Sequence, residues 1–211
     1  MGERFSSDCT WGDSGVPQRR SSCRILVSLL IIVSAAMTPA AYGETSPIPA
    51  RVQLLLFSKI WMFDRSVAEN DQIVMAVLYQ STFRASTEAK DQLIEAARAE
   101  GLKIRCVPIA LDDVAHISNE LQRVKADVFY LTEMRGIDIL EVVRVSRARQ
   151  IKTITVVAGY VEAGVAIGLR VRNDKPIIVV NLKAAKAEGS DLTAQLLRVA
   201  TIIGDKGSDT Q

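Results

Sequence analysis

Apolar runs of strand length alternate with segments of helical pattern along most of this chain, and no other feature limits its fold as strongly. Strands are expected at 72–79, 103–109, 126–131 and 152–157, and helices at 86–100, 112–125 and 136–149. Helices of this length between strands imply that the strands pair in parallel and that helices cover both faces of the sheet. The sequence therefore predicts an α/β fold built as a single domain.

The last third of the sequence departs from this alternation and predicts a β-hairpin. Two short strands, 165–171 and 176–180, flank the tight turn 172–175. After the hairpin, a short helix is expected at 181–188 and a final helix, capped by Ser190 and Asp191, through Ile203. The expected sheet is therefore mixed but mostly parallel, with helices on both faces and a C-terminal β-hairpin.

The first expected helix, residues 50–64, is apolar around most of its circumference and also carries Phe57, Trp61 and Phe63. Such a helix is either buried in the core or covered by a second chain, and both interpretations stay open here. Aromatic side chains concentrate binding energy at interfaces, so the second interpretation makes these three residues the partner-binding anchors. A Trp61→Glu change would then weaken partner binding without unfolding the domain.

The N-terminus has the three parts of a secretory signal peptide. Three arginines precede the apolar run 25–36, and small residues ending at Gly43 follow it. The run is too short to span a bilayer, which takes about 20 apolar residues. We expect a signal peptide at 1–43 that is cleaved after Gly43, a domain at 44–204 and a disordered tail at 205–211. An uncleaved membrane anchor is the alternative.

Composition and motifs point away from nucleic-acid binding and from catalysis. The chain has 26 basic and 24 acidic residues, so it lacks the basic excess that attracts nucleic acid. His116 is the only histidine, and no nucleophile motif accompanies it. Cys106 is the only cysteine beyond the expected leader, and one histidine with one cysteine cannot complete a zinc site. We expect no catalytic residue, no metal, no cofactor and no enzymatic activity.

Cys106 and a group of three glycines each have a structural interpretation and one functional alternative. Cys106 lies in an expected strand and should behave as a small buried hydrophobe, with interchain pairing or redox sensing as the alternative. Gly159, Gly164 and Gly168 match no phosphate-binding motif and should serve chain turns. A small-ligand site at this turn is the alternative, because ligands favour the carboxyl ends of strands in open α/β sheets.

Two charged clusters are assigned to helix ends. Asp112 and Asp113 are adjacent, so they point in different directions on a helix and do not form a carboxylate pair. We expect them to open a helix, because acidic side chains favour its positive end. A basic cluster near the end of a later helix should stay solvated, with docking of an acidic partner as the alternative. This cluster consists of Arg144, Arg147, Arg149 and Lys152.

Three C-terminal segments carry motifs that can be compared with a known family. Residues 160–167 place an aromatic residue, a glutamate and a glycine before a strand. Residues 176–185 form a strand that ends in Asn-Leu before an alanine-rich helix, and residues 191–200 place paired leucines before a basic residue. In these segments, and in the pattern of nearly the whole mature chain, the sequence resembles the YfiR/HmsC family of periplasmic regulators.

Gly164, Asn181 and Leu182 occupy motif positions of that family, and we interpret them as structural. Asn181 ends an expected strand and can cap the following helix. Family members often carry cysteine pairs in this domain, whereas Cys106 is alone, so control by a disulfide is not expected.

The resemblance implies a periplasmic protein that binds the periplasmic domain of an inner-membrane diguanylate cyclase and restrains it. Such a negative regulator limits cyclic-di-GMP signalling and biofilm formation, and a sensor kinase is another partner of this kind. The resemblance also implies that a homodimer can form. A periplasmic small-molecule binding or sensor module is the alternative function.

Overall fold

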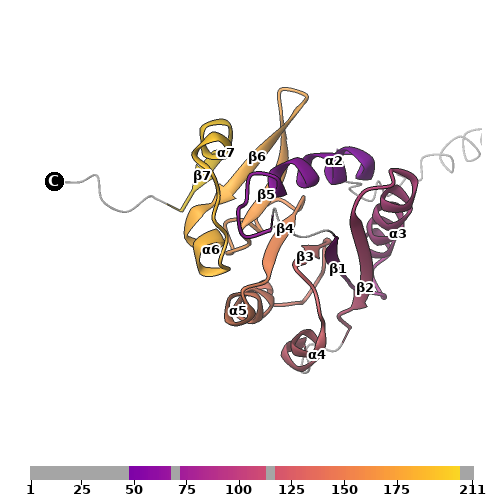
Figure 1. The fold of residues 1–211 in the computed structure, drawn as a ribbon. Helices are drawn as coiled ribbons and strands as arrows, with labels where there is room; N and C mark the ends of the chain where they lie inside the picture. Colours follow the sequence, from indigo (N-terminus) through magenta and orange to yellow (C-terminus); the bar gives the residue numbers. More distant parts are fainter. Residues whose placement is uncertain (1–47, 68–71, 113–116, 205–211) are drawn as a thin grey trace, which may run out of the picture. The chain divides into compact units, whose positions relative to one another are not determined.

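The computed structural model describes residues 48–67, 72–112 and 117–204 (Figure 1), which all belong to one compact unit, Tyr42–Gln211. The predicted signal peptide, His116, Asp113 and the predicted tail lie outside the described residues. The helices are α2 (Ala50–Trp61), α3 (Arg84–Ala99), α4 (Ile117–Arg123), α5 (Ile139–Arg149), α6 (Leu182–Ala187) and α7 (Ala194–Val199). The strands are β1 (Ile73–Tyr79), β2 (Ile104–Ala110), β3 (Val128–Leu131), β4 (Lys152–Thr155), β5 (Ile167–Arg172), β6 (Lys175–Asn181) and β7 (Thr201–Ile203).

The strands form one sheet of seven in the order β2-β1-β3-β4-β5-β6-β7. All neighbours pair in parallel except β5 and β6, which pair antiparallel as a hairpin. This confirms the predicted α/β fold with a mixed, mostly parallel sheet. The strand order reverses between β1 and β3, because the chain passes from β1 to its neighbour β2 and then crosses to the other side. In open α/β sheets such a reversal leaves a crevice at the carboxyl ends of the strands.

Helices cover both faces of the sheet and create two hydrophobic cores. Along β1, Met75 and Val77 join one core and Ala76 and Leu78 join the other, as the alternation of side chains in a strand requires. The first core packs the sheet against α2, α3, α6 and α7, and the second packs it against α4 and α5. The central strands β1 and β3 are therefore apolar on both sides, which explains their continuous apolar runs in the sequence.

The hairpin turn has the backbone that its sequence predicts. Asn173 and Asp174 both have positive φ, 51° and 57°, which is the geometry of a two-residue type I′ turn. Asparagine and aspartate tolerate this left-handed region better than other residues with a side chain. The turn sets the register in which β5 faces β6.

The C-terminal segment differs from the prediction of one long helix. The helix α7 ends at Val199, Ala200 is extended, and Thr201–Ile203 forms the edge strand β7 beside β6. Ser190 and Asp191 do not cap it, since Thr193 precedes α7. The run Thr201-Ile202-Ile203 is β-branched throughout, which favours a strand once an open sheet edge is available.

Asn181 caps α6, which confirms its predicted structural role. Its side-chain oxygen accepts from the N–H of Ala184 at 3.0 Å, and its amide donates to the carbonyl of Val161 at 3.1 Å. We expect Asn181→Ala to lower the free energy of unfolding by about 1–2 kcal/mol, because a cap and a second hydrogen bond are lost together. Asn181→Asp keeps the cap acceptor and should cost less. Urea denaturation of both variants measures this, and an alanine variant as stable as the parent would contradict it.

Candidate functional site

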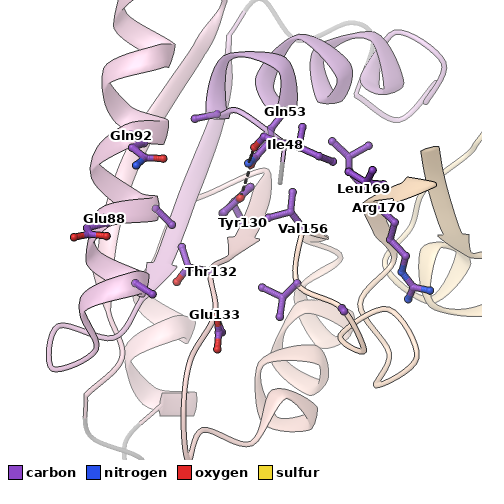
Figure 2. Close-up of a pocket in the computed structure, with 16 residues that line it drawn as sticks. Ile48, Gln53, Glu88, Gln92, Tyr130, Thr132, Glu133, Val156, Leu169 and Arg170 are labelled. Atoms are coloured by element: carbon purple, nitrogen blue, oxygen red, sulfur yellow. Dashed lines mark hydrogen bonds between the residues drawn. The ribbon is translucent and has the colours of Figure 1, made fainter. Parts of the chain in front are cut away.

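A cavity of about 660 Å³ opens where β3 and β4 end (Figure 2). Its walls come from the start of α2, the first half of α3, the segments that follow β3 and β4, and the outer part of β5. The cavity thus lies at the carboxyl edge of the sheet, close to the reversal of strand order. This is the usual ligand position in open α/β sheets, and the volume is within the range of small-molecule sites, about 300–1,000 Å³.

One face of α3 supplies a wall of the cavity. Ala85, Glu88, Ala89 and Gln92 follow the spacing that places side chains on a single helical face. The two alanines leave space that longer side chains would fill. The sequence shows this stripe as a row of small and polar residues, a signal that our sequence analysis did not use.

The inner wall is fixed by buried hydrogen bonds. The Tyr130 hydroxyl donates to Oε1 of Gln53 at 2.6 Å (dashed line in Figure 2), and Nε2 of Gln53 donates to the carbonyl of Ile48 at 2.6 Å. Burial raises the pKa of Tyr130 far above its ordinary value, so this hydroxyl stays protonated and neutral. The bonds join β3 to the start of α2 at the inner wall of the cavity.

Three charged side chains line the cavity, and two of them are compensated. Nη2 of Arg170 contacts both carboxylate oxygens of Glu162, and this hydrogen bonding lowers the pKa of Glu162 below its ordinary value. Glu88 accepts from Nε of Arg84 at 2.6 Å. Glu133 is half-buried and makes no hydrogen bond or ion pair with another residue in the described ranges. The uncompensated charge of the cavity is therefore a carboxylate.

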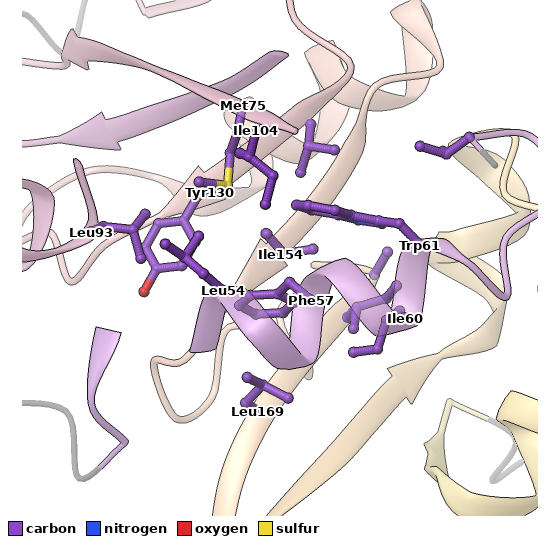
Figure 3. Close-up of a cluster of buried hydrophobic side chains, with 14 of the residues drawn as sticks. Leu54, Phe57, Ile60, Trp61, Met75, Leu93, Ile104, Tyr130, Ile154 and Leu169 are labelled. Atoms are coloured by element: carbon purple, nitrogen blue, oxygen red, sulfur yellow. The ribbon is translucent and has the colours of Figure 1, made fainter. Parts of the chain in front are cut away.

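The predicted aromatic anchors are mostly core residues, which corrects the expectation of an exposed contact surface on α2. Phe57 is 0% exposed and Trp61 is 2% exposed. Figure 3 shows both rings within the first core, where Phe57 lies 6.3 Å from Trp61 and meets Tyr130 edge-on at 6.1 Å between ring centroids. Phe63 is half-buried and packs against the same core. The rings of Phe57 and Trp61 project from α2 towards the sheet, which shields them from solvent.

The family-motif positions have structural surroundings. Gly164 has φ of 118°, and a Cβ atom there would lie 3.1 Å from the side chain of Arg147 and 3.3 Å from that of Val143. The positive φ favours glycine here, and a larger residue would also require these two side chains to shift by a few tenths of an ångström. Leu182 is half-buried and begins α6 directly after the Asn181 cap.

Asp112 and Arg149 both make hydrogen bonds to neighbouring segments. The Asp112 carboxylate accepts from the N–H of Ser81 at 2.7 Å and the hydroxyl of Ser81 at 2.6 Å, which ties the ends of β2 and β1 together. The helix start predicted at Asp112 and Asp113 falls at 113–116, outside the described residues. Arg149 is not simply solvated, because its Nη1 donates to the carbonyls of Leu121 and Val124 at 2.6 and 2.7 Å. Cationic side chains commonly satisfy the last carbonyls of a helix in this way.

A buried glutamate at the end of α6 was missed by the sequence analysis. Glu188 is 0% exposed and accepts from the N–H and hydroxyl of Thr153, both at 2.7 Å, and from the hydroxyl of Ser146 at 3.1 Å. Burial raises its pKa to about 7, although these hydrogen bonds and the charge of Arg147 oppose the shift. The side chain joins α6 to β4 and α5.

Cys106 is a free, half-buried thiol on β2. Burial raises its pKa to about 11, with the charge of Arg98 opposing this, so the thiol is protonated at neutral pH. Within 48–67, 72–112 and 117–204, no three His, Cys, Asp or Glu side chains gather as a metal site would need. No helix in the same ranges is long and apolar enough to cross a membrane.

The sequence matches the YfiR/HmsC-like family over residues 61–201. The chain belongs to this family. This membership agrees with the resemblance found in the C-terminal motifs. The comparison with curated proteins gave no match.

Solved structures with a similar fold share 16% sequence identity with this YfiR/HmsC-like chain. A ligand-free, open substrate-binding protein with adhesive properties from Clostridium difficile has a TM-score of 0.60 and matches 75% of this chain and 61% of its own. A conserved domain protein from Vibrio cholerae has a TM-score of 0.57, with 73% and 60% matched. The ABC domain from Streptococcus pneumonia, in complex with L-Trp, has a TM-score of 0.56, with 74% and 60% matched. At this identity the likeness concerns the fold alone, and the chain spans about 60% of the length of these structures.

Proposed function

We propose that this protein is a periplasmic regulator that binds the periplasmic domain of an inner-membrane diguanylate cyclase and restrains it. Binding would favour the inactive state of the cyclase, and release would reactivate it. The outcome would be lower cyclic-di-GMP output and less biofilm. The family match over residues 61–201 is the observation that carries this proposal. The predicted signal peptide, residues 1–43, would deliver the domain to the periplasm.

The protein would act by binding and not as an enzyme. Within the described residues, the cavity is lined by apolar, amide, hydroxyl and charged side chains. Its two hydroxyls bond to the carbonyl of Leu78 and to Gln53 and not to a base that could activate a nucleophile. The homodimer implied by the family resemblance is part of the same proposal.

We place the partner contact at the exposed apolar side chains near the β7 edge of the sheet. Met62 is 75% exposed at the end of α2, Val199 is 71% exposed on α7, and Ile202 is 42% exposed on β7. The two segments are joined because Asp64 forms a β-bridge with Leu192. Exposed apolar residues beside an open strand edge favour contact with another protein. This surface replaces Phe57 and Trp61, whose rings are buried, as the proposed contact with the partner.

The contact surface can be tested by charge insertion. We expect Met62→Asp combined with Val199→Asp to reduce recovery of the membrane partner about tenfold or more, because a charge must be desolvated in the interface. Leu140→Asp is the matched control, since Leu140 is 54% exposed on α5 at the other face of the sheet. Crosslinked pull-down from membranes and cellular cyclic-di-GMP are the readouts. Unchanged recovery with the double variant would contradict this placement.

A small-molecule sensor module is the second candidate function, and the cavity at the carboxyl edge favours it. This function does not exclude the first, because a ligand could bias the regulator between bound and released states. A ligand-dependent rise in melting temperature would distinguish a sensor from a regulator that only binds protein.

A further inference from the structure

We propose that the cavity at the ends of β3 and β4 binds a small amphipathic organic cation, with an apolar body inside and an ammonium group at Glu133. The cavity is large for a site that holds only water, since one water occupies about 30 Å³ of the liquid. At about 660 Å³ it accepts a molecule of the size of an aromatic amine with room to spare.

The walls favour an apolar body. The inner surface is formed by side chains such as Ala89, Val156 and Leu169, and Val156 and Leu169 also pack on the first core. The buried Tyr130–Gln53 pair uses its own polar atoms internally, so it offers an aromatic surface more than a binding group. Burial of apolar ligand area against such walls contributes about 25 cal/mol per Å².

The charges favour a cation over an anion. Arg170 is compensated by Glu162, and Glu88 by Arg84, whereas Glu133 has no ion pair among the described residues. An anion in the cavity would face the Glu133 carboxylate without a free cationic group to balance it. An ammonium group would gain a charge-assisted hydrogen bond there.

No cationic side chain among the described residues forms an ion pair with Glu133. The closest arginine in the sequence, Arg135, lies over the ring of Phe83 with 4.3 Å between its guanidinium carbon and the ring centroid. The backbone N–H of Arg135 is held by Gln80 at 2.9 Å.

The test uses three probes of one shape: 2-phenylethylamine, 2-phenylethanol and phenylacetate. Titration calorimetry and thermal melting are carried out on the tagged protein purified in its native processed form. We expect the amine to bind about tenfold tighter or more than the neutral alcohol, because a charge-assisted hydrogen bond is added, and phenylacetate to bind least. Equal or tighter binding of phenylacetate would overturn the proposal.

Single-residue variants test whether the amine binds in this cavity. Glu133→Gln should reduce amine affinity about tenfold and leave alcohol affinity unchanged, since it removes the charge and keeps the shape. Glu120→Gln is the matched control, because Glu120 is an exposed glutamate on α4 at the opposite face. Ala89→Phe fills the cavity from α3 and should abolish binding of both probes. Amine binding that survives Glu133→Gln or Ala89→Phe would place the ligand elsewhere. These outcomes are independent of partner recovery, so the ligand site and the regulatory proposal fail separately.

Discussion

Phe57→Ala should destabilise the domain by about 3–5 kcal/mol, the usual cost of removing a large aromatic side chain from a core. The ring of Phe57 is fully buried and touches both Trp61 and Tyr130, so alanine would leave a cavity between α2 and the sheet. Domains of this size have about 5–15 kcal/mol of stability, and the loss would therefore leave little margin. Urea denaturation followed by circular dichroism measures it.

Trp61→Glu should have a larger effect, because it places a charge at a position that is 2% exposed. We expect an unfolded or insoluble protein and not a folded protein that has lost its partner. Phe63→Ala is the control, since Phe63 is only half-buried and should cost less. A soluble, fully stable Trp61→Glu variant with weakened partner binding would restore the aromatic contact surface on α2.

Glu188 should make the domain less stable as pH rises from about 5 to 7. Its pKa is about 7 in the folded state and 4.5 ordinarily, so the unfolded chain loses its proton first over this interval. The raised pKa therefore stabilises the fold at low pH, and this contribution is lost as the buried carboxyl ionises. At about 1.4 kcal/mol per pKa unit, the loss is on the order of 3 kcal/mol and is complete above about pH 7.

Glu188→Gln isolates this effect because glutamine resembles the neutral acid. Relative to the parent, the variant should gain stability steadily between about pH 5 and pH 7.5. Urea denaturation at several pH values gives the difference in free energy of unfolding between the variant and the parent. The titration of all other groups contributes equally to both proteins and cancels in this difference. A parent and variant with parallel pH profiles would show that Glu188 does not titrate in this range.

Strands β1 to β6 could be predicted because each has a local sequence pattern of apolar residues or turn residues. The continuous apolar run of β1 and the Asn-Asp turn before β6 need no knowledge of the rest of the molecule. The strand β7 could not be predicted in this way. Its three residues continue an amphipathic helical pattern, and only the open edge of β6 decides that they form a strand.

The sites depend even more on contacts between distant segments. The sequence showed that the α2 helix is apolar, but only the sheet beneath it decides that Phe57 and Trp61 are covered. The cavity is assembled from five parts of the chain, and Glu133 differs from the other charged lining residues only because no side chain among the described residues forms an ion pair with it. Glu188 looks like an ordinary helix end until Thr153, 35 residues away, is placed against it.

The central claim is best tested by crosslinked pull-down of the tagged protein from its own membranes, with mass spectrometry of what is recovered. The regulatory account predicts an inner-membrane diguanylate cyclase with a periplasmic domain, lost with the Met62→Asp, Val199→Asp double variant and kept with Leu140→Asp. Recovery of the folded protein alone, with no membrane partner, would contradict that account.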